Sequence, residues 1–327
     1  MTSEDVNLKK AAEYVGGAEI ISLLPHISAD GDSIGAAFAL KLAFWRLGKQ
    51  VTVYLEEEIQ KRYLFAVDGI DFKIVDDGEE AGKIASDLVI ILDCAVKNRL
   101  GNRVNILDNA KKTMCIDHHV SSGGEFADLN YIDTKWAAAC IGVYKLINEL
   151  NIKMADRIAS LIYIGLVTDT GGFRFSNTNP EAHIIAADLI KYNIDTQQIS
   201  MNVFDNITYG RYMLTGEIGK RTEFFYDGKV CVCYLPEEAF IEHGATEEDG
   251  DGIVNYLRNI EGVEVAVYIK DKKDDLKISM RSKNYVDVSS VAQIFSGGGH
   301  PRAAGANWDG DYSSLKEKLL AELGKVI

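Results

Sequence analysis

The stretch IISLLPHISADGDSIGAAFALKLAFWRL, residues 20–47, decides how the first half of the chain folds. It begins with a short apolar run, passes through a polar loop from His26 to Asp32, and ends in a helix-like apolar segment from Ser33 to Leu47. This order predicts a strand, a loop that carries polar groups, and a helix.

The same alternation continues along the chain from Glu19 to Asp117. Three more β-rich apolar runs follow the first, namely VTVYL (51–55), LVIILD (88–93) and TMCID (113–117). Short β-rich runs that alternate with helical segments predict an α/β fold with a mainly parallel sheet covered by helices. In such sheets ligands gather at the carboxyl ends of the strands, where His26, Asp93 and Asp117 would lie.

The second half of the chain has the pattern of a smaller α+β domain. We expect apolar helices over 136–150 and 155–167, a helix that starts at 179–181, polar helical sequence over 197–220, a hairpin turn at 226–229 and a final helix over 312–323. These features predict a first domain over 1–190, a helical connector over 191–221 and a second domain over 222–327, with a cleft between the domains.

Composition restricts the classes of function. The chain has 327 residues, 47% of them hydrophobic, and its polar start and lack of a long apolar run predict a cytoplasmic protein with no membrane partner. Its five cysteines lie mostly in apolar runs, as reduced buried thiols do. With 35 basic and 49 acidic residues the net charge is −14, which opposes binding of long duplex nucleic acid and leaves a small anionic substrate open.

Acidic and imidazole side chains follow the apolar runs. The segment HISADGDSIG (26–35) holds His26, Asp30 and Asp32; a turn in which Asp32 or Ser33 caps the helix is an equally good interpretation of this segment alone. Asp93 and Asp169 each close an apolar run, where a charge is costly unless it is paired, solvated or coordinated. Asp117, His118 and His119 close another run, and four of the six histidines lie in the segments that carry these residues and the glycine run near the C-terminus.

This set of side chains suits a pair of hard or borderline metal ions. Carboxylates and imidazoles without thiolates favour Mn²⁺, Mg²⁺, Co²⁺ or Fe²⁺ over a structural zinc. Two such ions, bridged by a carboxylate, can activate water and neutralise charge on a phosphoryl group. The sequence therefore predicts two-metal hydrolysis of a phosphate ester.

A glycine run near the C-terminus offers an anion site. The run FSGGGHPRAAGA (295–306) places Gly298 and Gly299 before His300 and Arg302. Glycines let backbone N–H groups approach an anion, although a flexible turn is the common meaning of such a run. Nearby Arg281 and Ser282, within a basic stretch of Lys270, Lys272, Lys273, Lys277 and Lys283, favour the anion site; a solvated hairpin is the alternative for that stretch.

Taken together, these motifs resemble the DHH phosphoesterase superfamily, over nearly the whole chain. The motifs HISADGDSIG, LDCA, IDHH and TDTGGFRF match its DHH metal-binding catalytic domain, and MRSKNYVDVSSVAQIFSGGGHPRAAGA is similar to its DHHA1 substrate-binding domain. The resemblance implies one metal on His26, Asp30 and Asp93 and a second on Asp32, Asp93, His118 and Asp169. It also implies that Asp117 orients the histidines, that His119 touches the phosphate, and that Arg281, Ser282 and His300 hold the far end of a nucleotide.

Within that superfamily, the length and the two-domain plan resemble the group of nanoRNases and 3′-phosphoadenosine-5′-phosphate phosphatases. This resemblance implies hydrolysis of short oligoribonucleotides and removal of the 3′-phosphate of 3′-phosphoadenosine-5′-phosphate, with two divalent ions, Mn²⁺ first and Mg²⁺ or Co²⁺ as alternatives. A phosphodiesterase for cyclic dinucleotides or their linear products, and a nucleotide-binding regulator without catalysis, are the competing functions. Dimers are common in the family, so a homodimer is among the arrangements open to this chain.

Overall fold

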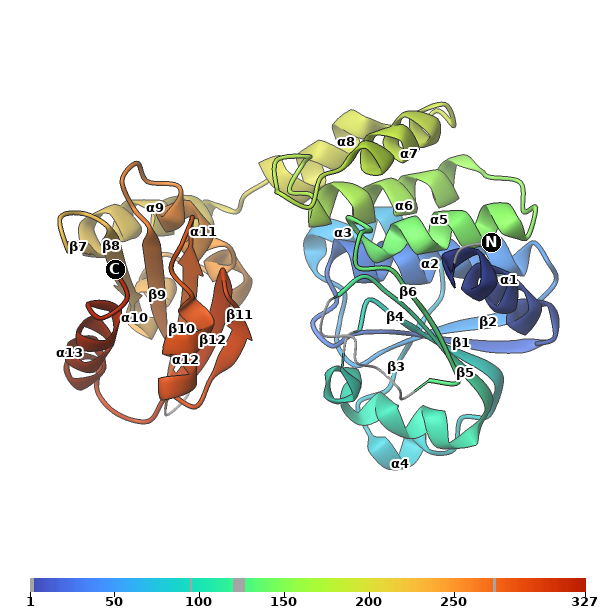
Figure 1. Ribbon diagram of the computed structural model, residues 1–327, viewed down its shortest axis with the longest axis horizontal. Helices are drawn as coiled ribbons and strands as arrows, with labels where there is room; N and C mark the ends of the chain where they lie inside the picture. The colour runs from blue at the N-terminus through green and yellow to red at the C-terminus, as the bar shows by residue number, and fades with distance from the viewer. Residues whose placement is uncertain (1–2, 95, 120–126, 273–274) are drawn as a thin grey trace. The chain divides into compact units, whose positions relative to one another are not determined.

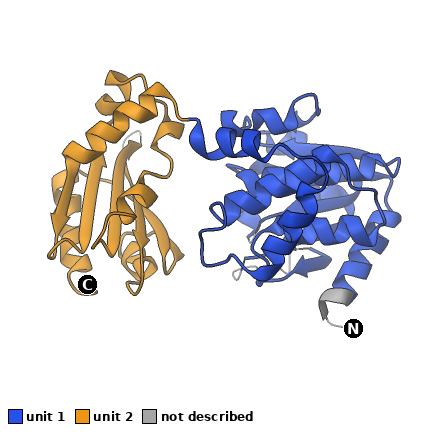
Figure 2. Cartoon of the chain, turned by 90° about the horizontal axis from the view of Figure 1, so that it is seen from above, with its two compact units in different colours: residues 1–206 blue, residues 207–327 orange. Residues whose placement is uncertain are grey.

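The computed structural model describes residues 3–94, 96–119, 127–272 and 275–327, so Ala95 of the LDCA motif and Lys273 of the basic stretch lie outside the described residues. The chain divides into two compact units, residues 1–206 and residues 207–327 (Figure 2). Each unit has its own sheet and its own hydrophobic core.

Unit 1 is built on a six-stranded sheet whose paired strands all run parallel, in the order β3-β2-β1-β4-β5-β6. The strands are β1 (Ile20–Pro25), β2 (Gln50–Leu55), β3 (Lys73–Ile74), β4 (Ser86–Leu92), β5 (Ala110–Asp117) and β6 (Leu129–Ile132). The predicted parallel sheet is thus confirmed. Because the strands are parallel, β1, β4 and β5 end at the same edge of the sheet.

Helices cover both faces of this sheet (Figure 1). Leu88, Ile90 and Leu92 of β4 face the larger core, whereas Val89 and Ile91 face the smaller one. The larger core is covered by α1 (Ser3–Gly16), α2 (Gly31–Trp45), α3 (Lys61–Val67), α5 (Ala139–Glu149), α6 (Asp156–Asp169) and α7 (Pro180–Ile190); the smaller one is covered by α4 (Gly78–Ala81) and η1 (Lys97–Asn109). Two short elements, α8 (Thr196–Ser200) and the π-helical turn η2 (Met201–Asp205), end the unit.

Unit 2 has a mixed six-stranded sheet in the order β11-β12-β10-β9-β8-β7. Only β8 and β9 pair in parallel among its described strands. The strands are β7 (Thr222–Phe225), β8 (Val230–Leu235), β9 (Val265–Lys272), β10 (Asp275–Ser282), β11 (Gly298–His300) and β12 (Ala303–Trp308). One face packs on α12 (Val288–Ile294) and α13 (Tyr312–Leu323), and the other on α9 (Tyr209–Arg221), α10 (Glu237–Glu242), η3 (Glu247–Gly250) and α11 (Ile253–Arg258).

Several local predictions can be compared with these bounds. The final helix covers 312–323 as expected, and residues 226–229 connect the antiparallel strands β7 and β8. The helix expected over 136–150 instead begins at Ala139, because the first N–H groups of α5 bind the carboxylate of Asp32. All five cysteines are buried and unpaired with one another, as predicted. Among the described residues, none of the helices has the length and apolar character that a bilayer crossing needs.

Candidate active site

Three neighbouring strands of unit 1 deliver the first site residues. His26 directly follows β1, Asp93 directly follows β4, and Asp117 is the last residue of β5. The strands lie side by side in the order β1-β4-β5, so these residues meet at one edge of the sheet. Asp93 adopts a left-handed backbone with φ of 53°, and its N–H donates to Ile116 O at 3.0 Å, which fixes the chain as it leaves β4.

The loop between β1 and α2 supplies two more carboxylates. Asp30 caps α2, accepting hydrogen bonds from the N–H groups of Asp32 and Ser33 at 3.1 Å each, so the cap is neither Asp32 nor Ser33. Asp32 is fully buried and accepts from the N–H groups of Ala139 and Cys140, at 2.5 and 2.9 Å. These donors begin α5, and the N-terminal end of a helix stabilises a negative charge.

Close packing of α2 on α6 positions the last carboxylate, Asp169, at the end of α6. Two glycines permit this approach. A Cβ on Gly35 would lie 2.4 Å from Leu161 O, and one on Gly165 would lie 2.7 Å from Oδ1 of Asp32. Larger residues at these positions would push the two helices, and the carboxylates that they carry, apart.

Asp93 joins two clusters of potential ligand atoms. Its Oδ2 lies 3.4 Å from Nε2 of His26, which is 3.6 Å from Oδ1 of Asp30. Its Oδ1 lies 3.5 Å from Nε2 of His118, and that nitrogen is 3.1 Å from Oδ2 of Asp169. Oδ2 of Asp32 completes the second cluster at 3.9 Å from Nε2 of His118. The ligand atoms of His26, Asp30 and Asp93 lie within 4.8 Å of one another, as do those of Asp32, His118 and Asp169, so each group could hold a metal ion. Asp93 also forms such a group with Asp117, His118 and His119.

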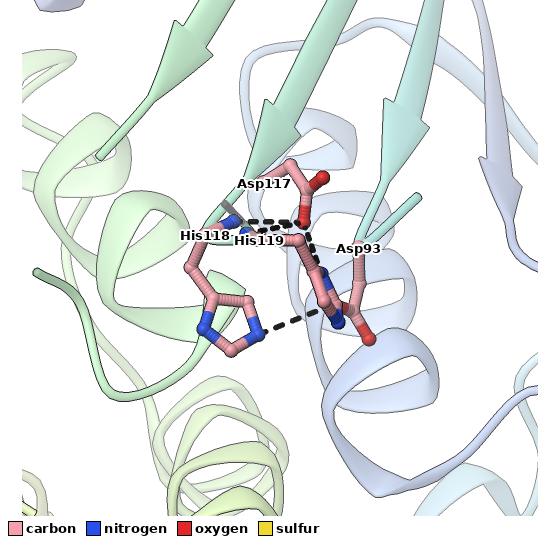
Figure 3. A group of neighbouring side chains, drawn as sticks. All are labelled: Asp93, Asp117, His118 and His119. Atoms are coloured by element: carbon pink, nitrogen blue, oxygen red, sulfur yellow. Dashed lines mark hydrogen bonds and ion pairs between the residues drawn. The ribbon is translucent and has the colours of Figure 1, made fainter. Parts of the chain in front are cut away.

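Asp117 holds the paired histidines in place (Figure 3). Its Oδ1 accepts hydrogen bonds from the backbone N–H groups of His118 and His119, at 2.7 and 3.3 Å, and lies 2.8 Å from Nδ1 of His119. His118 turns its Nε2 toward Asp169, whereas His119, with 27% of its side chain exposed, turns Nδ1 toward Asp117. The two adjacent rings therefore serve different partners.

The clustered imidazoles and carboxylates shift one another's pKa values. Burial lowers the pKa of His26, but hydrogen bonds and charge from Asp30 and Asp93 overcome it and raise the pKa to about 10. For His118 the same balance, with Asp169, Asp93 and Asp32 as partners, raises the pKa to about 12. Burial and neighbouring carboxylates raise the pKa of Asp32 and of Asp169. The crowded carboxylates therefore hold their protons to higher pH than usual. A bound cation would compensate their negative charge and lower these pKa values again.

The residues present fit divalent metal ions. Oδ1 of Asp93 is buried and accepts no hydrogen bond of good geometry from the described residues; Nε2 of His118 and Nδ1 of His119 both lie 3.5 Å away. A bound cation would compensate this buried carboxylate oxygen. The ligand atoms are carboxylate oxygens and imidazole nitrogens. Burial raises the pKa of the nearby Cys94 and Cys140 thiols, which keeps them protonated and out of a ligand set. Oxygen and nitrogen ligands of this kind suit Mn²⁺, Mg²⁺ or Co²⁺.

Sequence reasoning did not identify Arg99, which lies against the site. A terminal nitrogen of its guanidinium is 2.9 Å from Nδ1 of His26, and its carbonyl accepts the N–H of Ile27 at 2.8 Å. Nδ1 of His26 is also 2.6 Å from Ile27 O, which favours a proton on Nδ1 and leaves Nε2 to face the carboxylates. Because a guanidinium only donates, the contact of Arg99 with a protonated Nδ1 is a close approach and not a hydrogen bond. A lone arginine six residues after Asp93 in a polar segment gave no signal of its own.

The substrate residues predicted near the C-terminus lie in unit 2. Arg281 and His300 each pair with Ala303 in the sheet, which places both on one face, beside α11. Ser282 belongs to the opposite face, is only 2% exposed, and donates to Pro301 O at 3.3 Å. Burial lowers the pKa of Arg281, and the charge of Arg258 lowers it further, so two arginines lie near each other on this face.

The glycine run has a structural explanation at two of its positions. A Cβ on Gly297 would lie 2.2 Å from Gly305 O, and one on Gly299, whose φ is 145°, would lie 2.4 Å from Ala303 O. Gly298 instead faces open space. Arg302, in the turn after His300, donates to Val286 O at 2.6 Å and so helps to hold the hairpin.

The basic stretch around these residues is partly neutralised. Lys270 is buried and its Nζ lies 2.7 Å from Oε1 of Glu247. Lys283 donates to Ile260 O at 3.0 Å. Of the described lysines in this stretch Lys270 is the one that pairs with a carboxylate, whereas Lys272, Lys277 and Lys283 are exposed and Arg281 lies near Arg258.

Comparison with known proteins agrees with this geometry. Residues 20–166 match the model of the DHH family, N-terminal domain, and residues 227–327 match the model of the DHHA1 domain. The bifunctional oligoribonuclease and PAP phosphatase NrnA of Thermus thermophilus is 30% identical over 302 residues, which cover 92% of this chain and 88% of that protein. The protein of the same name from Bacillus subtilis is 27% identical over 315 residues, which cover 93% of this chain and 94% of that protein.

Solved structures share the fold. An exopolyphosphatase-related protein from Bacteroides fragilis has a TM-score of 0.92 at 24% identity, with 98% of this chain and 96% of that chain covered. An exonuclease RecJ bound to manganese has a TM-score of 0.53 at 16% identity, with coverage of 97% and 94%. At these identities the likeness establishes the architecture alone.

Proposed function

The chain belongs to the DHH family of phosphoesterases, and on that premise we propose that it hydrolyses short oligoribonucleotides to mononucleotides and removes the 3′-phosphate of 3′-phosphoadenosine-5′-phosphate. Relatives over most of the chain carry both activities in their names. Both substrates combine a nucleoside 5′-phosphate with a 3′-linked phosphate. One anchoring site and one hydrolytic centre would therefore serve both.

The position of Asp93 carries this proposal. One of its oxygens faces His26 and Asp30, and the other faces His118 and Asp169, so a single carboxylate would bridge two ions. His26, Asp30 and Asp93 would hold the first ion, and Asp32, Asp93, His118 and Asp169 the second. Two divalent ions, when bound, polarise a phosphoryl oxygen and make water a nucleophile at neutral pH. The ligand types favour Mn²⁺, with Mg²⁺ or Co²⁺ as substitutes.

The remaining polar residues of unit 1 act on the phosphate. Asp117 fixes the His119 ring through Nδ1 at 2.8 Å, so Nε2 of that ring would face the substrate. Hydrogen bonding to Asp117, the main cause, raises the pKa of His119, which favours a charged ring that stabilises an anionic phosphate or protonates the leaving oxygen. Asp117 would act as a positioning residue rather than as a ligand.

Unit 2 would anchor the far end of the substrate. Arg281 and His300 lie on one face of the sheet beside the exposed Gly298, so charge and accessible backbone occur together. We assign catalysis to residues 1–190, a connection to 191–221, and substrate anchoring to 222–327. With a net charge of −14, the chain has few means of holding a long strand, and we expect oligomers of about two to five nucleotides to be hydrolysed fastest.

A timed hydrolysis series tests this function. RNA oligomers from two to about twenty-four nucleotides would be compared with and without a 5′-phosphate, at fixed salt and with Mn²⁺. 3′-Phosphoadenosine-5′-phosphate and cyclic dinucleotides would be included, and Asp93→Asn would serve as the inactive control. Fastest cleavage of 5′-phosphorylated short oligomers supports the proposal. Faster cleavage of the longest strands, or indifference to the 5′-phosphate, contradicts it.

A further inference from the structure

The TDTGGFRF motif, residues 168–175, contains more than the proposed metal ligand Asp169. Directly after that residue the backbone enters a turn in which Gly171, Gly172 and Phe173 are all left-handed, with φ of 57°, 69° and 63°. A phenylalanine rarely adopts this conformation, because its Cβ crowds the following carbonyl oxygen. Strain of this kind persists where the surroundings demand it and is concentrated at functional sites.

The turn shapes a cavity on unit 1. A pocket of about 340 Å³ lies between α6, the turn and the short elements α8 and η2, within the range of about 300–1,000 Å³ that small ligands occupy. Its walls include Tyr163, Phe173 and Phe204 as aromatic rings, and Arg174, Ser200 and Asp205 as polar groups. The lining residue Phe204 belongs to a π-helical turn, a feature that is also frequent at functional sites.

The pocket contains one cationic side chain, Arg174, and one carboxylate, Asp205, and neither forms a salt bridge with a described residue. Nε of Arg174 donates to Gly171 O at 2.6 Å, and among the described residues no hydrogen bond or ion pair engages its two terminal nitrogens. Asp205 accepts a hydrogen bond from Ser200 at 3.2 Å and pairs with no cationic side chain in the described part of the chain. Both side chains are exposed, so an anion on Arg174 and hydroxyl donors on Asp205 would take the place of solvent there.

The aromatic walls complete the pattern. Phe173 stacks on His183 with ring centroids 4.9 Å apart and planes tilted by 24°, which fixes the orientation of a ring that also lines the pocket. Phe204 is 37% exposed, a large fraction for a phenylalanine that adjoins a cavity. Aromatic rings of this kind stack against any of the four nucleobases.

From these observations we propose that the pocket is a second nucleotide site, separate from the metal centre, that binds a nucleoside 5′-monophosphate. The base lies against the aromatic walls, the ribose hydroxyls donate to Asp205, and the phosphate pairs with Arg174. The choice of a mononucleotide rests on the proposed function, since that reaction releases one. Its binding, however, requires no turnover.

Hydrogen–deuterium exchange tests the site directly. Metal-free protein would be measured with and without adenosine 5′-monophosphate, and we expect slower exchange in segments 170–175 and 196–206. Arg174→Gln should abolish this protection. Phe204→Ala, which leaves the hydrogen bonds of the turn intact, should weaken binding about tenfold. Phe224→Ala alters a similarly exposed ring on β7 and should leave the protection unchanged.

Each outcome decides the proposal. Protection of both segments that both pocket variants reduce supports a nucleotide site. Protection confined to unit 2, or protection of segments 170–175 and 196–206 that survives in Arg174→Gln and Phe204→Ala, overturns it. Hydrolysis of oligomers is measured separately, so failure of the proposed reaction and failure of this site are distinguishable.

Discussion

Glu264 is a buried carboxylate on which the predicted anion loop of unit 2 depends. The residue is 4% exposed, and its Oε1 accepts backbone N–H groups of Asn284, Tyr285 and Val286 at 3.0, 2.7 and 3.1 Å. Its Oε2 accepts the side-chain amide of Asn284 at 3.0 Å. The carbonyl of Val286 in turn binds Arg302, in the turn that follows His300.

Glu264→Gln keeps the shape and removes the charge. The amide group that replaces one oxygen is a donor facing other donors, so part of the network is lost and at least one buried N–H is left without a partner. Hydrogen bonds to a charged group contribute about 1.5–3 kcal/mol each, and the net cost should be about 3 kcal/mol. For a unit of this size that corresponds to a fall of about 10 °C in the melting temperature of unit 2.

The pH dependence has a definite sign. Burial would raise the pKa of Glu264, but the hydrogen bonds from Val286, Tyr285 and Asn284 outweigh it and hold the pKa below its ordinary value. The stabilisation is therefore fully present above the unfolded pKa of about 4.3 and is lost as the pH falls through the folded value. The difference between wild type and Glu264→Gln should shrink below about pH 4.

Thermal unfolding followed by circular dichroism and calorimetry measures this effect. Glu261→Gln, at an exposed position three residues earlier, is the matched control and should unfold like the wild type. We also expect a higher KM for 5′-phosphorylated substrates in Glu264→Gln, because the hairpin that carries His300 loses support. A melting temperature within about 2 °C of wild type at neutral pH would refute the reasoning.

The other predictions concern the metal centre and the anchor. Asparagine can adopt the left-handed backbone of position 93, so Asp93→Asn should fold normally. We expect it to lower the rate at least ~10²-fold in steady-state kinetics. Retention of more than a tenth of the wild-type rate would contradict the bridging role. The pKa values of about 10 for His26 and about 12 for His118 keep both rings protonated at neutral pH without metal. Metal binding should therefore release protons, and the metal affinity should increase as the pH rises between about 6 and 9. Calorimetry in buffers of different ionisation enthalpy would measure this proton release. A metal affinity that does not change with pH would exclude these ligands. Arg281→Ala should raise KM for 5′-phosphorylated substrates with metals still bound, and metal loss at unchanged KM would show that its role is misplaced.

Much of unit 1 could be predicted because its signals are local. An apolar run that ends in Asp93 or Asp117 indicates a buried strand followed by a charged residue, whose burial is costly unless the charge is compensated. Parallel strands bring these ends together at one edge of the sheet. The sequence alone could not distinguish two roles for Asp32, because a helix cap and a metal ligand have the same residue pattern at that position. The structure instead makes Asp30 the cap and buries Asp32 against the start of α5, a contact across more than a hundred residues.

Other features depend on contacts that sequence patterns do not encode. The faces on which Arg281 and Ser282 lie follow from strand register, which composition alone does not fix. Arg99 reaches His26 across 73 residues, and its neighbours in the chain carry no motif. The pairing of Lys270 with Glu247 likewise brings together separate elements and withdraws one lysine of the basic stretch from the surface.

The proposed reaction depends on one carboxylate, Asp93, that would join two metal ions. A crystal of the Mn²⁺-loaded protein, measured at the manganese absorption edge, locates each ion by its anomalous scattering. We expect two peaks in unit 1 about 3.5–4 Å apart, with one oxygen of Asp93 directed to each cluster. A single peak, or two ions of which either lies away from Asp93, would contradict it.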